Sequence, residues 1–179
     1  MKLFSKIPLL ENDRILLRKL EFDDAASLKE LTEDESVYSF LPTFLIERQQ
    51  IDMRKVILEM YEQSFKEKES LIWGIFLKDG MRFCGLAELY GFKDPIHKIS
   101  LGYRLQKRFW GQGIATETVA LIVDYLYSQT DIEIITASTM IENHASANVL
   151  SKNGFMMVVS AVEEDWGYET MTIADKWIR

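Results

Sequence analysis

The sequence has little cysteine and histidine and no long apolar run. Its 179 residues include one cysteine, Cys84, which excludes an internal disulfide and a metal site built from several cysteines. The two histidines share no helix spacing with Cys84, so a metal site of mixed ligands is not expected either. The longest uninterrupted apolar run, 71–77, is far short of the roughly 20 residues that a membrane helix needs.

Positive charge is also scarce. The chain carries 21 Lys and Arg against 28 Asp and Glu, for a formal net charge of −7. This balance argues against general nucleic-acid binding, because affinity for phosphate backbones comes from clustered Lys and Arg. Hydrophobic residues make up 47% of the chain, as in ordinary globular domains. The apolar segment 7–10 is too short for a signal peptide. We therefore expect residues 1–179 to form one cytoplasmic domain.

Strand and helix patterns alternate along the chain, which predicts a mixed α/β (α+β) fold. The expected strands are 14–20, 71–77, 81–90, 99–105, 132–139, 155–162 and 168–177. The expected helices are 25–31, with Asp23 or Asp24 as N-cap, 46–65, 114–128 and 145–153. Lys-Asp-Gly at 78–80 predicts a hairpin turn, because Asp-Gly tolerates positive φ.

A glycine loop runs from the end of the expected strand 99–105 into the helix that begins at 114. Gly111 and Gly113 allow the backbone to approach a ligand without an intervening Cβ. The first free N–H groups of the helix point to the same place, at the positive end of its dipole. This arrangement predicts a site for a pyrophosphate. The same glycines also suit a tight strand-to-helix turn without a ligand.

Basic residues stand beside this loop although the chain is acidic. Arg104, Lys107 and Arg108 are expected to add positive charge next to the backbone donors. The spacing of a P-loop is absent, and a Rossmann loop needs Gly or Ala where Thr116 stands. Neither nucleotide-binding motif fits.

Residues 110–117 read Trp-Gly-Gln-Gly-Ile-Ala-Thr-Glu and resemble the acetyl-CoA loop of the GNAT acetyltransferase superfamily. The similarity is to the branch that includes the ribosomal-protein N-terminal acetyltransferases. Leu-Gly-Tyr-Arg-Leu at 101–105 resembles the strand before that loop, and residues 143–155 resemble the second motif of the branch. Ser100 stands where this strand commonly carries an acid, so no catalytic glutamate is carried over to that position.

The resemblance implies an acyl-CoA N-acyltransferase fold. In that fold helices flank a central, mostly antiparallel mixed sheet with a splayed parallel strand pair, here 99–105 and 132–139. It implies direct transfer of an acetyl group from acetyl-CoA to a primary amine, either a protein N-terminus or a small amine. Metal, nucleic acid and membrane are not implied, and the protein is expected as a monomer or homodimer. Ser100 also leaves open a non-catalytic acyl-CoA-binding or sensing module.

The resemblance assigns acetyl-CoA to the strand end, the loop and the start of two helices. Backbone groups of 103–105 are implied to line the pantetheine arm and to polarise the thioester carbonyl, and 111–116 to hold the pyrophosphate. The expected cofactor-binding residues are Tyr103, Arg104, Leu105, Arg108, Trp110, Gly111, Gln112, Gly113, Ile114, Ala115, Thr116, Asn143 and Ser146.

The reaction requires the amine to lose a proton and the leaving thiolate to gain one. Ser146 is the expected hydroxyl at the thiol, and Asn143 is expected to cap the same helix and to bind the pantetheine arm. Glu88 is the candidate base. A solvent-facing role for Glu88, a base role for His144 and a base role for water remain open.

Aromatic residues surround the expected acceptor side. Tyr38, Phe40 and Phe44 either form a wall of the acceptor pocket or fasten the first two helices to the core. The segment 168–177, with Trp166, is expected to face the acceptor from the other side.

Overall fold

The computed structural model describes residues 3, 5–93 and 95–179, and strands from these ranges form one eight-stranded sheet in the order β1-β2-β3-β4-β5-β6-β8-β7. The strands are β1 (Leu10–Glu11), β2 (Ile15–Arg18), β3 (Ser70–Leu77), β4 (Arg82–Lys93), β5 (Lys98–Leu105), β6 (Ile134–Met140), β7 (Met156–Glu164) and β8 (Thr172–Ile178). Neighbours are antiparallel except β5 and β6, which are parallel. The expected mixed, mostly antiparallel sheet is therefore confirmed.

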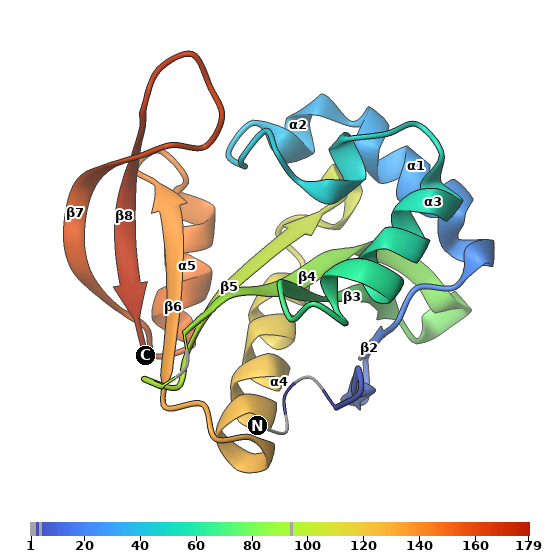
Figure 1. The fold of residues 1–179 in the computed structure, drawn as a ribbon, viewed down its shortest axis with the longest axis horizontal. Coiled ribbons are helices and arrows are strands. Elements are labelled where there is room, and N and C mark those ends of the chain that lie inside the picture. Colours follow the sequence, from blue (N-terminus) through green and yellow to red (C-terminus); the bar gives the residue numbers. More distant parts are fainter. Residues whose placement is uncertain (1–2, 4, 94) are drawn as a thin grey trace.

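Helices cover both faces of this sheet (Figure 1). They are η1 (Phe22–Asp24), α1 (Ala25–Glu33), α2 (Glu35–Tyr38), η2 (Ile46–Arg48), α3 (Met53–Leu58), η3 (Glu59–Ser64), η4 (Asp79–Met81), η5 (Lys107–Phe109), α4 (Ile114–Gln129) and α5 (His144–Lys152). One core joins α4 and α5 to one face, and a second core joins α1, α2, α3 and η3 to the other. The sheet thus separates two helical layers.

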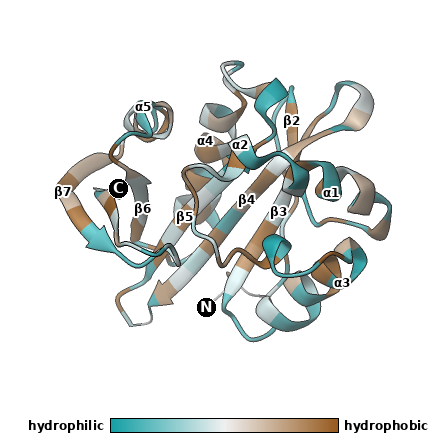
Figure 2. Ribbon diagram, turned by 90° about the horizontal axis from the view of Figure 1, so that it is seen from above, coloured by the Kyte–Doolittle hydropathy of each residue, from teal (hydrophilic) through white to brown (hydrophobic). Residues whose placement is uncertain are grey.

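The interior strand β3 is buried along its whole length, as its largely apolar sequence requires. Hydrophobic residues recur along β3 and β4, and brown segments mark these strands in Figure 2. The turn between these strands contains Gly80 at φ 69°, as the Asp-Gly signal predicts.

Strands β5 and β6 pair over only part of their length. Their registered pairs end at Ser100 and Thr136, and the two strands then diverge, as Figure 1 shows. Beyond that point β5 continues to Leu105 and β6 to Met140. The expected splayed parallel pair is present, joined by the expected helix α4.

The expected long helix 46–65 is wrong. The structure has a single turn at η2, a break, and then α3 running into the π-helical turn η3. A new helix, α3, begins after Asp52, because the Asp52 carboxylate acts as an N-cap and accepts from the amides of Arg54 and Lys55. The side chain of Asp24 does not cap α1, since it pairs with Arg18 and accepts from the amide of Glu21.

Candidate active site

The loop before α4 presents backbone donors that have no protein partner. Gly111 and Gly113 adopt positive φ of 71° and 79°, and Gly113 caps the helix without any side-chain hydrogen bond. Within the described ranges, the amides of residues 111–116 donate no hydrogen bond, and the first helical bond runs from Glu117 to the carbonyl of Gly113. A Cβ at Gly111 would meet nothing within 4 Å. Open space, free N–H groups and a 16-residue helix dipole all suit an anion here.

Exposed cations flank the loop, and one of them was not expected. Lys107 and Arg108 are exposed, and Arg108 pairs loosely with Glu30 at 3.2 Å. Arg14 lies 98 residues earlier, yet its Nη1 donates to the carbonyl of Gln112 at 2.9 Å. The same nitrogen pairs with Glu117 at 2.5 Å. No local motif around Arg14 signals this role, because the contact forms only when β2 lies beside the loop.

The prediction that Arg104 adds charge beside this loop is wrong. Arg104 is 4% exposed, and its guanidinium lies between two carboxylates. Nη1 donates to Glu88 at 2.9 Å, and Nη2 donates to Glu47 at 2.7 Å. Burial alone would lower the pKa of Arg104, but the two carboxylates outweigh it and raise that pKa. The guanidinium therefore stays charged and balances buried acids instead of a ligand.

Replacing Arg104 is expected to damage folding rather than binding of an anion at the loop. Arg104→Leu leaves two carboxylates without their partner, which costs about 3–5 kcal/mol of unfolding free energy at neutral pH. Burial raises the pKa of Glu88, and Arg104 opposes that rise. Without Arg104 the pKa of Glu88 in the folded protein rises further above its value in the unfolded chain. The free energy of unfolding therefore falls as the pH increases through this folded-state pKa. Urea unfolding should show a smaller deficit at pH 5 than at pH 7. Unchanged stability with weakened CoA binding would contradict this account.

Two hydroxyls and an amide meet beside the divergent strands. The Tyr103 hydroxyl of β5 donates to Ser146 Oγ of α5 at 3.1 Å. Burial raises the pKa of Tyr103 to about 12, although the bond to Ser146 lowers it, so the phenol is neutral at pH 7. Asn143 Oδ1 accepts from the Ser146 amide at 3.1 Å and so caps α5. Its Nδ2 donates to none of the described residues. Sequence reasoning considered only the backbone of Tyr103 and missed its hydroxyl.

Side chains outside the loop fix its two ends. The Trp110 indole donates to the carbonyl of Leu105 at 2.8 Å, which ties the loop to the end of β5. Asn153, which is buried, donates to the carbonyl of Thr116 at 3.2 Å and to that of Val149 at 2.9 Å. The first turn of α4 is thereby attached to the end of α5.

Glu88 lies on the opposite face of the sheet from Ser146. It is registered against Gly102, which has no side chain to cover it. Residues alternate between the faces of a strand, so Glu88, Gly102 and Arg104 share the face covered by α1 to α3, whereas Tyr103 shares the other face with α5. The registered pairing of β5 with β6 ends at Ser100, two residues before Gly102.

Two loops meet on the Glu88 face. The Thr43 amide donates to the carbonyl of Trp166 at 2.8 Å, and the Tyr168 hydroxyl donates to the carbonyl of Leu41 at 2.7 Å. The connection from α2 to η2 therefore contacts the connection from β7 to β8. Tyr38 is buried in the core, Phe40 is half-buried and Phe44 is exposed. Of these aromatics, Tyr38 packs in the core that joins the helices to the sheet.

The remaining titratable candidates lie apart from this arrangement. His144 is exposed at the start of α5, and His97 pairs with Glu133 at 3.8 Å in a loop. Among the described residues, no cluster of three or more His, Cys, Asp and Glu is arranged to hold a metal ion. In the same part of the chain, no helix combines the length and apolar character needed to cross a bilayer.

Sequence comparison places this geometry among known proteins. The family described as "Acetyltransferase (GNAT) domain" matches residues 14–156. The probable N-acetyltransferase YjcK of Bacillus subtilis is 30% identical over 155 residues, covering 82% of this chain and 83% of that protein. The uncharacterized N-acetyltransferase YoaA of the same organism is 25% identical over 148 residues, covering 83% and 82%. The putative ribosomal N-acetyltransferase YdaF of B. subtilis is 24% identical and covers 81% and 79%.

Solved structures share the fold. A GNAT-family acetyltransferase from Bacillus anthracis superposes with a TM-score of 0.81 at 18% identity, covering 96% of this chain and 98% of that one. The spermidine N-acetyltransferase of Vibrio cholerae, solved with CoA and spermine, has a TM-score of 0.76 at 17% identity, covering 94% and 96%.

Proposed function

The chain belongs to the GNAT family of N-acetyltransferases, and from that premise we propose that it transfers the acetyl group of acetyl-CoA directly to a primary amine. The observation that carries the proposal is the run of unpartnered amides at 111–116 beside the Tyr103–Ser146 pair. The amides suit a pyrophosphate, and the hydroxyl pair stands where the strands diverge. The V. cholerae relative solved with CoA supports this choice of donor.

The residues present fit two parts of acetyl-CoA, the pyrophosphate and the pantetheine arm. The amides of 111–116, with Arg14, Lys107 and Arg108, would hold the pyrophosphate. The β5 edge beyond Ser100 and the free Nδ2 of Asn143 would bind the pantetheine arm. Acetyl-CoA supplies a thioester whose carbonyl carbon accepts the amine.

Proton movements are assigned to groups on the two faces. The amine nitrogen forms a bond to the acetyl carbon while the carbon–sulfur bond breaks. We assign the amine proton to Glu88, on the face where the α2–η2 and β7–β8 connections meet. Ser146 donates its proton to the departing sulfur, and Tyr103 restores it through the bond at 3.1 Å. The Tyr103 phenol then takes a proton from solvent, and Glu88 releases the amine proton to solvent.

Removing the Ser146 hydroxyl is expected to slow turnover. Ser146→Ala should lower kcat about 10-fold with little change in the KM for acetyl-CoA, because a thiol of pKa ~8.5 is already a fair leaving group. Ser151→Ala, an exposed position on the same helix, is the matched control. Equal kcat values for Ser146→Ala and Ser151→Ala would contradict a role of the Ser146 hydroxyl in the reaction.

The proposed function is tested by incubating the protein with acetyl-CoA and a panel of polyamines, amino acids and short peptides with free N-termini. Thiol release is followed with a thiol reagent, and the product is identified by mass spectrometry. Cys84 is buried, and burial raises the pKa of its thiol, so the native protein should add little background. An acetylated amine in equal amount to released thiol supports the proposal. Tight CoA binding without any acetylated product would favour the acyl-CoA-binding or sensing alternative.

The acceptor is proposed only by class. The relatives' names include a spermidine and a putative ribosomal acetyltransferase, so small amines and protein N-termini both belong in the panel. We propose residues 1–179 as one domain, since the B. anthracis structure superposes on 96% of them.

A further inference from the structure

Two carboxylates share the buried guanidinium of Arg104, and they do so unequally. Glu47 Oε1 lies 2.5 Å from Arg104 Nε and also accepts from the Tyr38 hydroxyl at 3.2 Å. Glu47 Oε2 accepts from Arg104 Nη2 at 2.7 Å. Both oxygens of Glu47 are therefore engaged, and its side chain is 0% exposed.

Glu88 binds the same guanidinium through one oxygen. Its Oε2 accepts from Arg104 Nη1 at 2.9 Å, while Oε1 makes no hydrogen bond within the described ranges. The side chain is 14% exposed. Of the two acids, only Glu88 keeps an oxygen that an acceptor amine can reach.

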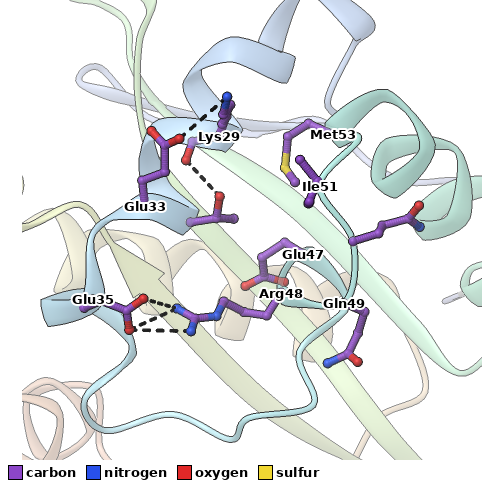
Figure 3. A pocket seen from close by; sticks show the side chains of 10 residues that line it. Lys29, Glu33, Glu35, Glu47, Arg48, Gln49, Ile51 and Met53 are labelled. Carbon is purple, nitrogen blue, oxygen red and sulfur yellow. Dashed lines mark hydrogen bonds and ion pairs between the residues drawn. The ribbon is translucent and has the colours of Figure 1, made fainter.

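The segment that supplies Glu47 holds it in this position. Glu47 belongs to the short turn η2, and its neighbour Arg48 points toward Glu35 (Figure 3). Arg48 pairs with Glu35 at 3.4 Å and lies 4.4 Å from the centre of the Tyr38 ring. Arg48 therefore does not compete with Arg104 for Glu47. Glu47 and Arg48 of this turn line the pocket drawn in Figure 3, which has a volume of about 320 Å³.

We propose that Glu47 is a positioning residue for the acetyl transfer: by accepting from Nη2 of Arg104 and forming an ion pair with Nε, it prevents bidentate hydrogen bonding of the guanidinium to Glu88 and keeps one Glu88 oxygen free as the base. This proposal rests on the proposed function. A guanidinium freed on that side can present two parallel N–H groups to one carboxylate, which is its preferred geometry. Both Glu88 oxygens are then bound, and the base is lost.

The charges around Glu88 determine in which direction its pKa moves when Glu47 is replaced. Among the described residues, Glu88 interacts electrostatically with Arg104 on β5, Glu47 on η2 and Tyr90 on its own strand, and the Tyr38 phenol on α2 faces Glu47 and Arg104. Burial raises the pKa of Glu88, Arg104 lowers it, and Glu47 raises it. Removing the charge of Glu47 is therefore expected to lower the pKa of Glu88, because the repulsion from Glu47 is lost and Arg104 can bind Glu88 more strongly.

The experiment compares Glu47→Gln, Glu47→Asp and Glu35→Gln with the wild type. The Glu88 carboxyl is titrated by carbon-13 NMR in the free protein, and the pH dependence of kcat/KM is measured with the best acceptor. Glu47→Gln should lower the Glu88 pKa and the acid limb of the profile by about one pH unit, and lower kcat about 10-fold. Glu47→Asp keeps the charge and should leave the limb in place. Glu35→Gln, which removes the partner of Arg48, should match the wild type.

A purely structural role for Glu47 changes stability without moving the titration. An unmoved Glu88 pKa in Glu47→Gln, with an active wild type, overturns this proposal and leaves the proposed function standing. If Glu47→Gln does not fold, Glu47→Asp decides: an acid limb and a kcat close to those of the wild type support the proposal, and a limb displaced downward, or an unmoved limb with reduced kcat, overturns it. A wild type that acetylates no amine overturns both proposals.

Discussion

Glu88→Gln is expected to reduce kcat about 10²- to 10³-fold while the protein remains folded. The amide oxygen can still accept from Arg104 Nη1, so the buried guanidinium keeps that partner. What is lost is the group that takes the amine proton. Because burial, with a contribution from Glu47, raises the pKa of Glu88 above the ordinary value of ~4.3, the acid limb of the wild-type profile should lie above that value.

The measurement is a pH profile of kcat/KM for both proteins. Activity of the wild type should rise with pH as Glu88 loses its proton, and the variant should lack this limb. Glu163→Gln, the same substitution at an exposed position on β7, controls for the loss of one negative charge. A wild-type kcat in Glu88→Gln would show that Glu88 is not the base, and would leave water or His144 as the candidates.

Gly111→Ala is expected to raise the KM for acetyl-CoA about 10- to 100-fold. Gly111 has φ 71°, and its added Cβ would point into space that no protein atom occupies within 4 Å. The substitution therefore adds backbone strain of about 1–2 kcal/mol and displaces amides that each contribute about 1.5–3 kcal/mol to a charged ligand.

Gly80→Ala separates these two effects. Gly80 has φ 69° in the hairpin turn between β3 and β4, and a Cβ there also meets no atom closer than 3.7 Å. Both variants should lose similar unfolding free energy, but only Gly111→Ala should weaken CoA binding, measured by calorimetry and by KM. Equal CoA affinities in the two variants would contradict binding of the pyrophosphate at the loop 111–116.

The parts of the site that are contiguous in sequence were predictable. The loop 110–117 carries its glycines, its helix start and its basic flank within a few residues, and Asn143 and Ser146 stand one helical turn apart. The same holds for the strands, whose alternation and hairpin turn are local patterns. These features need no knowledge of which segments meet.

The parts that depend on long-range contacts were not predictable. Arg14 reaches the loop across 98 positions, and Glu47 reaches Arg104 across 57. The error at Arg104 has a specific cause: sequence proximity to the loop suggested a shared site, but strand alternation directs its side chain to the other face of the sheet. The predicted helix 46–65 failed because apolar spacing does not reveal that Asp52 begins a new helix.

The central claim is that donor and amine occupy opposite faces of the sheet at once and react directly where β5 and β6 separate. Initial velocities at several fixed concentrations of the best acceptor, with acetyl-CoA varied, test it most directly. Direct transfer predicts double-reciprocal lines that intersect and a protein that carries no acetyl group after incubation with acetyl-CoA alone. Parallel lines together with an acetylated protein would contradict the account.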